Sequence, residues 1–494
     1  MTALLPLVIL GPMVVAGALV GLRVSRRTRQ AVLFAVLVGS LAAAAWLVAA
    51  TSGGAVLVTR LGGWPAPIGV PFAVDAFSAL MLVLTVLLTT VVCAFALRSR
   101  AADEPYFCPL VLVVTAGVNG ALMTADLFNL FVFIEIMLLP SYGLIILAHR
   151  GRGKRMQVSA SRIYVTVNLL TSALFLAGVA AIYATLGAVD LAGLAGRAER
   201  SPWTLLACGI VLFALSVKAA VVPVHGWLGR TYPHLSPTVS ALFASLHTKV
   251  AVYAIFRLYA VLFDERRLGW LITTVFCISM VVGVLGAVGE DNARAILSFH
   301  MVSQIGYVLL GVGIFTGASL SAGIFYLIHN VIAKASLFLS TGAVELRYGR
   351  HRLGEVRGLL WRETVTGLTF LAAAVSLAGL PPFSGFVAKL AIISAAFADQ
   401  QWAAGAVALG VSLFTLLSML KIWGAAFLGE PDPPLAADEG PRIGIRTIAP
   451  AAFLAVLSLA LGVTGQPVLA LCETAAAGLL HPAAYLAALS GGGV

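Results

Sequence analysis

The sequence contains few charged residues for its length. They make up 10% of its 494 positions, whereas soluble domains carry about 25%. Hydrophobic residues make up 61% of the chain, and the mean hydropathy is +1.03. No soluble core can bury this much apolar surface, but a lipid bilayer can. The shortage of charge therefore predicts an integral membrane protein.

Other absences exclude whole classes of chemistry. The five cysteines are scattered, and no pair has the spacing of metal ligands or of a redox motif, so we predict no disulfide framework and no metal site. The sequence has no phosphate-binding glycine loop, no dinucleotide fingerprint and no nucleophile motif. We therefore predict that the chain is not an enzyme and needs no cofactor.

Apolar runs of about 20 residues recur along almost the whole chain, and each is long enough to cross about 30 Å of hydrocarbon. They predict an all-α, polytopic protein in which residues 1–494 form a single membrane domain of about fourteen transmembrane helices. The small apolar tail after residue 470 is expected at the membrane interface. The spans are expected near residues 3–22, 31–51, 74–97, 108–124, 126–148, 163–186, 203–230, 237–262, 269–288, 295–315, 318–346, 367–397, 402–428 and 447–468.

Lysine and arginine in the loops indicate the orientation. An even number of spans divides the loops into two alternating sets, and one set carries twenty basic residues whereas the other carries five. Cytoplasmic loops are the ones enriched in Lys and Arg, so we predict that both termini face outside. The net charge of +11 is then a topology signal, and we predict no nucleic-acid partner. The twenty are Arg23, Arg26, Arg27, Arg29, Arg98, Arg100, Arg150, Arg152, Lys154, Arg155, Arg162, Arg230, Arg294, Arg347, Arg350, Arg352, Arg357, Arg362, Arg442 and Arg446, and the five are Arg60, Arg197, Arg200, Arg266 and Arg267.

Two of the predicted spans are interrupted. The span at 203–230 contains Pro223 near its middle, and the span at 367–397 contains Pro381 and Pro382. Each break lies a few residues from a lysine, and the two spans run in opposite directions. Corresponding broken helices in halves of inverted topology are a sequence signal for a transport site. Two ordinary proline kinks are the alternative interpretation.

Five ionisable residues lie near the middle of predicted spans. Each costs about 2.5–3.5 kcal/mol at the centre of a helix that faces lipid. They must therefore face the interior of the helix bundle, near one another or near water, which predicts a path for protons or small cations. The five are Glu135, Lys218, Lys249, Lys334 and Lys389.

Glu135 stands in an apolar run, and Lys218 is the predicted partner of its carboxylate. Burial favours a neutral carboxyl group, whereas a nearby lysine favours the charged form. The carboxyl group of Glu135 can therefore change its charge when Lys218 moves. A static buried ion pair is the alternative, although such pairs add little stability. Lys249 follows His247 closely, and both can relay protons.

Other polar residues stand in or near the same spans. His329 lies five positions before Lys334, and His300 lies one helical turn from Gln304. Hydrogen-bonded structural histidines are the alternative for this group. Asp126 is expected to cap the outer end of its span, and Arg257 is expected to extend its side chain to the outer surface.

Five segments resemble a known family. They are similar to the proton-translocating antiporter-like subunits that respiratory complex I shares with the Mrp multisubunit sodium/proton antiporters, and most similar to the D subunits of the Mrp type. The resemblance covers about residues 70 to 430. The segments are Asp126 to Leu139, Lys218 to Leu228, Pro237 to Val250, Ser298 to Tyr307 and Gly379 to Lys389.

This resemblance implies a fold and a set of roles. It implies fourteen helices with two inverted five-helix repeats, at residues 108–262 and 269–428. Glu135 and Lys218 correspond to the family's coupled ion pair, Lys249 to the central relay and Lys389 to the gate of the far half-channel. His329 and Lys334 correspond to links between the halves. His225, His247, His300 and Asp126 are expected to support the path.

Taken together, these patterns predict a membrane subunit of a multisubunit antiporter that exchanges protons for sodium in the bacterial cell membrane. Its expected partners are the other subunits of the complex, protons, sodium ions and the lipid bilayer. The main alternative is a proton-pumping subunit of a quinone reductase or a membrane hydrogenase. A stand-alone transporter of an organic solute is a third hypothesis, with its substrate at the broken helices.

Overall fold

The structure is a computed structural model that describes residues 4–64, 69–147, 154–263, 268–350, 352–355, 357–429 and 440–491. Side chains are described from residue 157 onward in the segment that begins at 154. Arg150, Arg152, Arg266 and Arg267, which belong to the two sets of loop charges, lie outside the described residues, and the side chains of Lys154 and Arg155 are not described.

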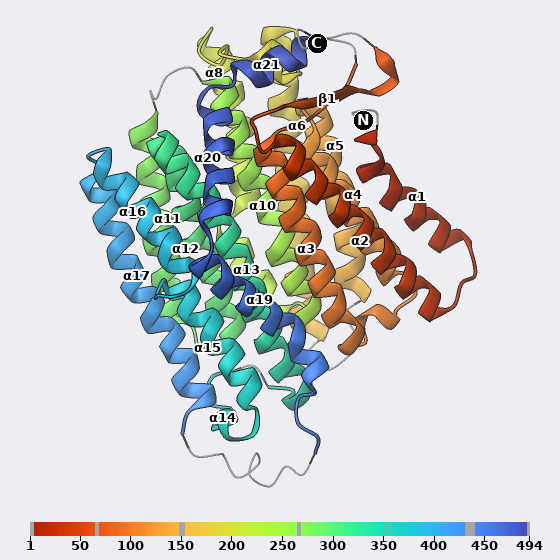
Figure 1. The fold of residues 1–494 in the computed structure, drawn as a ribbon, viewed down its shortest axis with the longest axis vertical. Helices are drawn as coiled ribbons and strands as arrows, with labels where there is room; N and C mark the ends of the chain where they lie inside the picture. Colours follow the sequence, from red (N-terminus) through yellow and green to blue (C-terminus); the bar gives the residue numbers. More distant parts are fainter. Residues whose placement is uncertain are drawn as a thin grey trace.

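Long helices stand side by side between an upper and a lower end of the molecule (Figure 1). The upper end also carries one small two-stranded sheet. The elements are α1 (Leu7–Gly21), α2 (Arg26–Thr51), β1 (Leu57–Arg60), η2 (Leu61–Gly63), β2 (Pro71–Val74), α3 (Ala76–Arg98), η3 (Ala101–Asp103), α4 (Phe107–Met123), α5 (Leu127–Leu147), α6 (Lys154–Leu186), α7 (Leu191–Leu194), α8 (Pro202–Ala219), α9 (Gly226–Thr231), η4 (Tyr232–His234), α10 (Pro237–Leu262), α11 (Gly269–Gly289), α12 (Ala293–Ile314), α13 (Gly317–Tyr348), α14 (Leu359–Arg362), α15 (Thr364–Ala378), α16 (Ser384–Ala398), α17 (Trp402–Ile422), η5 (Trp423–Phe427), α19 (Ile445–Val463), α20 (Gln466–Leu480) and α21 (Ala483–Ser490).

The prediction of an all-α, polytopic membrane protein is confirmed. In the described ranges, eleven helices are long and apolar enough to cross a membrane, or up to twelve if the bent pair α20 and α21 is one span. The predicted number is fourteen, and the difference arises from short helices. Four further apolar helices, α1, α4, α15 and α16, have only 10–17 residues each.

Three helices, α10, α12 and α13, form the centre of the bundle. Nearly all of their side chains are buried in the protein, whereas α2, α6, α11 and α17 expose a large apolar share. The central helices carry His247, Lys249, His300, His329 and Lys334. Polar groups inside a membrane are costly wherever they meet lipid, so the apolar outer helices shield the polar central ones.

Both predicted interruptions are present. Helix α8 ends at Ala219 and α9 begins at Gly226, while α15 ends at Ala378 and α16 begins at Ser384. The residues that end the first halves, Ala220 and Gly379, have positive φ angles of 61° and 88°. At Gly379 a side chain would also collide, because an added Cβ atom would lie 2.5 Å from Cδ of Lys389.

The sequence did not predict a third interruption, between α19 and α20. Helix α19 ends at Val463 and α20 begins at Gln466, and α20 continues to the upper end of the bundle (Figure 1). Cys472, Ala475 and Leu479 of α20 are buried against the protein. The expectation that the tail after residue 470 lies at the membrane interface is therefore wrong. Its small residues allow close helix packing instead.

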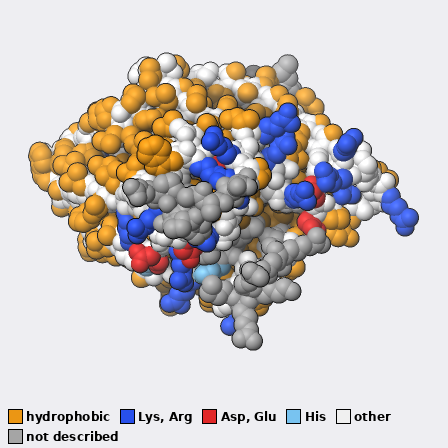
Figure 2. Space-filling view, turned by 90° about the horizontal axis from the view of Figure 1, so that it is seen from below, with side chains coloured by type: hydrophobic (Ala, Val, Ile, Leu, Met, Phe, Trp, Pro, Cys, Tyr) orange, Lys and Arg blue, Asp and Glu red, His pale blue; other side chains and the backbone are white. Residues whose placement is uncertain are grey.

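Loops and short elements cover the upper end. Strands β1 and β2 pair antiparallel, with Leu57 opposite Val74. Isolated bridges join Phe72 to Thr124 and Asp126 to Asp190, and they tie the start of α5 to this cover. Figure 1 shows both ends of the chain near the upper end. The lower end, seen in Figure 2, displays many of the arginine and lysine side chains around its rim.

Candidate functional site

The structure places all four lysines of the predicted path inside the protein. Lys218 of α8, Lys249 of α10, Lys334 of α13 and Lys389 of α16 are buried, and Glu135 of α5 is partly buried. Burial of so many ionisable groups requires polar hydrogen-bond partners. These partners are mostly hydroxyl groups and backbone carbonyl oxygens.

In the first half of the bundle, Lys218 does not touch its predicted partner. Its ammonium group donates a hydrogen bond to Oγ of Ser172 on α6, at 3.0 Å. Glu135 is close enough for its charge to interact with that of Lys218, yet its Oε1 atom is buried without a hydrogen-bond partner in the described part of the chain. The two groups are therefore coupled electrostatically but are not in direct contact.

The centre of the bundle carries His247 and Lys249, two positions apart within one turn of α10. Nε2 of His247 lies 2.8 Å from Oγ of Ser141 on α5, and its Nδ1 atom has no partner among the residues described. The ammonium group of Lys249 donates to Oγ1 of Thr248 at 3.0 Å. A fully buried lysine with one neutral acceptor is poised to exchange its proton rather than to hold a fixed ion pair.

In the second half, Lys389 reaches back to the break of its own span. Its ammonium group donates to the carbonyl oxygen of Ala378 at 2.7 Å and to Oγ of Ser412 at 2.8 Å. It also lies 5.5 Å from the ring centre of Tyr307, a favourable position for a cation. The carbonyl oxygen at the end of α15, which also accepts the hydroxyl of Ser412, thus provides a site for the lysine charge.

Lys334, His329 and His300 complete this half. Lys334 donates to the carbonyl oxygen of Leu297 on α12, at 2.9 Å. Nδ1 of His329 lies 2.9 Å from Oγ of Ser384 at the start of α16, and Nε2 of His300 bonds Ser418 on α17. One ring nitrogen of each histidine remains without a partner in the described residues.

These groups form one continuous series across the bundle. Each neighbouring pair interacts electrostatically, so a change of charge at one position alters the next. The series joins groups from both halves through Lys249 and Lys334 on the central helices. Its order is Glu135, Lys218, His247, Lys249, Lys334, His300, Lys389 and His329.

Two of the predicted supporting residues lie away from this series. His225 stands in the loop between α8 and α9, only partly buried, and its Nδ1 atom has no partner among the described residues. Asp126 caps α5 at the upper end, where its Oδ1 atom accepts the backbone N–H of Asn129 at 2.7 Å. Burial raises the pKa of Asp126, and the nearby Asp190 carboxylate adds to the rise.

The expectation for Arg257 is wrong. Its side chain does not extend to the surface but is buried, and Nη2 lies 2.7 and 2.6 Å from the two carboxylate oxygens of Asp75. Asp75 does not stand out in the sequence, because a carboxylate just before a span resembles an ordinary helix cap. It is also that cap, since it accepts the backbone N–H of Ser78.

The hydroxyl partners of the lysines and histidines are also missing from the predicted site. Ser141, Ser172, Ser384, Ser412 and Ser418 carry no distinctive sequence signal, because serine in apolar helices commonly bonds its own backbone. Only the three-dimensional neighbourhood separates these hydroxyls from the many others.

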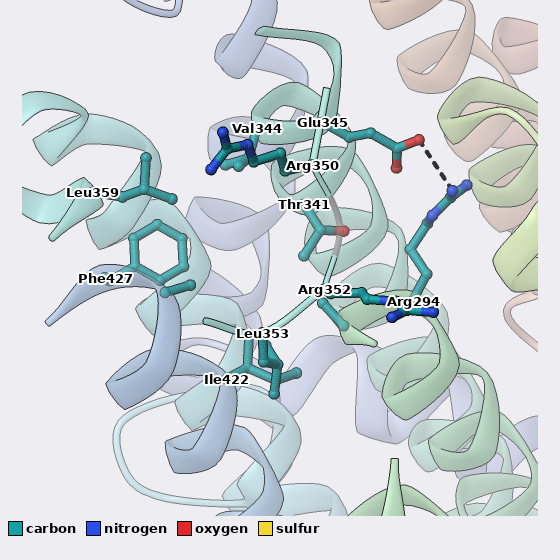
Figure 3. Close-up of a pocket in the computed structure, with 12 residues that line it drawn as sticks. Arg294, Thr341, Val344, Glu345, Arg350, Arg352, Leu353, Leu359, Ile422 and Phe427 are labelled. Carbon is teal, nitrogen blue, oxygen red and sulfur yellow. Dashed lines mark hydrogen bonds and ion pairs between the residues drawn. The ribbon is translucent and has the colours of Figure 1, made fainter. Parts of the chain in front are cut away.

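One pocket lies at the lower end, between the ends of α12, α13 and α17. Figure 3 shows the Arg294 side chain reaching Glu345, and their atoms Nη2 and Oε1 are 3.0 Å apart. Arg350, Arg352 and Phe427 also line it. None of the predicted path residues lines this pocket. Within the described ranges, no group of three or more His, Cys, Asp or Glu residues is arranged to hold a metal ion.

Comparison with known proteins identifies the family. Residues 124–415 match the family described as NADH:quinone oxidoreductase/Mrp antiporter, transmembrane. The chain belongs to this family. The D subunit of the Na(+)/H(+) antiporter of Alkalihalophilus pseudofirmus is 36% identical over 457 residues, which cover 91% of this chain and 92% of the relative.

Two solved structures have the same fold as this chain. A chain of the Mrp complex from Dietzia sp. DQ12-45-1b is 48% identical, with a TM-score of 0.95 over 99% of both chains. A chain of the membrane-bound sulfane sulfur reductase, an archaeal respiratory membrane complex, gives a TM-score of 0.87 at 23% identity, over 98% of this chain and 99% of that one. The second likeness concerns the fold alone. The resemblance seen in the sequence is thus confirmed at the level of the family.

Proposed function

We propose that this chain is the D-type membrane subunit of a multisubunit antiporter that exchanges protons for sodium ions. The buried series of titratable groups supports this function. The cation is inferred from a relative, since the A. pseudofirmus protein is named as part of a Na(+)/H(+) antiporter. The partners are inferred in the same way, since a chain 48% identical to this one belongs to an Mrp complex.

In this proposal, protons move along the series that begins at Glu135. A proton that neutralises Glu135 removes the negative charge facing Lys218. The lysine then feels mainly the positive charges deeper in the bundle and releases its own proton more readily. Lys249 and Lys334 carry this change across the centre, and Lys389 responds at the far end. His247 and His300 lie between lysines of the series and His329 lies beyond Lys389, and all three support the transfer.

The orientation follows from the loop charges. We infer that the lower end is cytoplasmic and that both termini face outside, because the basic loops exceed the others by twenty to five. The arginine and lysine side chains around the lower end are in keeping with this assignment (Figure 2). The membrane is then the bacterial cell membrane, as expected for relatives of bacterial origin.

The two broken helices support an internal repeat. We propose that residues 108–262 and 269–428 form two repeats of inverted topology. Under this correspondence α8 and α9 match α15 and α16, and α5 matches α12. The break of each pair carries a buried lysine nearby, Lys218 or Lys389. A transport site at the junction of such repeats is a recurrent arrangement in membrane transporters.

The test uses the whole complex in everted membrane vesicles. Glu135→Gln and Lys218→Ala should each abolish sodium-dependent proton exchange, measured with a fluorescent pH probe, while the complex still assembles. Asp103→Asn is the control, because Asp103 forms an ion pair with Arg26 at an exposed site. Normal exchange in either path variant, in complexes assembled to the normal level, would refute the assigned role.

A further inference from the structure

A buried arginine at the upper end lies between two cavities, each of which has a carboxylate in its wall. Arg257 of α10 uses only Nη2 to bind Asp75. Its Nε and Nη1 atoms are buried without a hydrogen-bond partner in the described part of the chain. Two unsatisfied donors on one guanidinium group are costly. They favour a second position of the Arg257 side chain in which these donors have partners.

The first cavity lies on the Asp75 side of the arginine. It has a volume of about 560 Å³ and is lined by Asp75 together with Ser52, Thr474, His481 and Tyr485. A water molecule occupies about 30 Å³ in the liquid, so this cavity has room for a cation together with its water shell. The carboxylate of Asp75 is its only acidic lining group among the residues described.

The second cavity also borders the arginine and is much smaller. Its volume is about 10 Å³, about that of one water site, and Arg257 lines it together with Asp126, Thr124 and Tyr253. Asp126 forms no ion pair among the described residues. Burial raises the pKa of this carboxyl group, and Asp190, joined to it by a backbone bridge, raises it further. Asp126 is thus a second carboxyl group beside the arginine with which a cationic side chain could pair.

Aromatic rings surround the guanidinium group. Its carbon atom lies 4.4 Å from the ring centre of Tyr485 and 5.8 Å from those of Tyr253 and Phe77. Ring faces attract a cation without fixing its direction. They can therefore stabilise the charge while the side chain turns from one carboxylate to the other.

We propose that Asp75 binds a monovalent cation that enters the larger cavity, and that Arg257 is a tethered competitor that moves toward Asp126 when the cation binds. The charges balance. The cation replaces the guanidinium group at Asp75, the guanidinium group pairs with Asp126, and a proton carried by Asp126 leaves when the guanidinium group arrives. This inference rests on the proposed function and assigns it a cation site at the upper end.

The test measures protons released when sodium chloride is added to the purified whole complex in weakly buffered detergent solution, with a pH indicator dye. Choline chloride at the same concentration corrects for ionic strength. The wild-type complex should release protons on addition of sodium. The complex with Asp126→Asn should release fewer protons than the wild type, because the protons contributed by this chain are lost. The complex with Asp103→Asn should release as many protons as the wild type.

Asp75→Asn should also abolish this part of the release, and in vesicles it should raise the sodium concentration for half-maximal exchange about tenfold, the effect of losing one charged contact. Because this variant leaves Arg257 buried without a counter-charge, the neutral double variant Asp75→Asn/Arg257→Gln provides the same test in a chain that carries no unpaired charge. Asp75→Glu keeps the carboxylate and should retain sodium-triggered release.

Glu135→Gln separates this inference from the proposed function. It should lose exchange in vesicles and keep sodium-triggered proton release in detergent. If Asp126→Asn and the neutral double variant both release protons like the wild type, the cation site is refuted, whatever Glu135→Gln does to exchange. Release that is lost with Asp75 but kept with Asp126→Asn would refute the movement of Arg257.

Discussion

The two broken helices differ in how tightly their breaks are packed. At the break between α8 and α9, Pro223 and Gly226 are exposed, and a Cβ atom added to Gly226 meets nothing within 4 Å. At the break between α15 and α16, Cβ on Gly385 would lie 1.7 Å from the carbonyl oxygen of Ser376. Gly226 beside the first break thus has space for a side chain, whereas Gly385 beside the second has none, although Pro381 and Pro382 of that break are exposed.

Their lysines differ in the same way. Lys218 has one hydrogen-bond acceptor, Ser172, and interacts with the charge of Glu135. Lys389 has two acceptors and an aromatic ring. No acidic residue stands near the middle of a helix between residues 293 and 422. Under the proposed function, the first half responds by moving charges apart, while the second half responds by changing the protonation of Lys389.

The largest expected effect tests the difference in packing. Gly385→Ala forces Cβ into the backbone at Ser376 and also to within 2.8 Å of the His329 ring, and overpacking of this kind costs about 1–3 kcal/mol or more. We expect it to remove most of the assembled complex, measured by size-exclusion chromatography of a fluorescent fusion. Gly226→Ala, the matched change at the open break, should assemble normally. Equal yields for the two variants would contradict the difference in packing.

A smaller effect is expected from the hydroxyl partners. Ser172→Ala leaves the buried ammonium group of Lys218 without an acceptor, which costs about 1–3 kcal/mol. It should slow exchange in vesicles about tenfold. Ser412→Ala should slow it about threefold or less, because Lys389 keeps the carbonyl oxygen of Ala378.

Thr274→Ala serves as control for these two variants, since this exposed hydroxyl bonds only its own helix. A larger loss for Ser412→Ala than for Ser172→Ala would reverse the comparison between the two halves. It would indicate that Lys389 depends on its hydrogen-bond acceptors more than Lys218 does.

The smallest expected effect concerns the caps of α5 and α12, which correspond under the proposed repeat. Asp126 caps α5 with a carboxyl group, and Asn292 caps α12 with an amide. Because burial raises the pKa of Asp126 in the folded protein, its contribution to stability is full below about pH 4, the pKa of an unfolded aspartate, and falls as the pH rises.

Asp126→Asn keeps the cap and removes the loss of stability that accompanies a rise in pH. The apparent melting temperature of the variant should exceed that of the wild type by a few degrees at about pH 8 and match it near pH 4. Thermal unfolding of the purified complex at the two pH values checks this. A variant that is less stable at both pH values would show that the carboxylate makes contacts beyond the cap.

The sequence predicted the membrane class, both broken helices and the residues of the central series. These features leave strong signals, because an ionisable group in an apolar run is costly and therefore rare. Glu135 and Lys249 are visible for this reason. The family resemblance added their order along the path.

Other features could not be predicted from one sequence. The ion pair between Asp75 and Arg257 joins residues 182 positions apart, and each residue alone fits a common surface pattern. The break between α19 and α20 falls at residues 464–465, and the proline beside it, Pro467, stands in the first turn of α20, where proline is common. The contact of Lys218 with Ser172 depends on how α6 packs against α8, which hydropathy does not specify.

Helices α10 and α13 are enclosed by the other helices of this chain. Neighbouring subunits can touch only the outer helices of this chain, so they have no direct access to Lys249 or Lys334. Any influence they exert on the path must arrive as mechanical displacement or as a long-range field. Under the proposed function, the proton path is therefore insulated, and subunits communicate with it through movements of the outer helices.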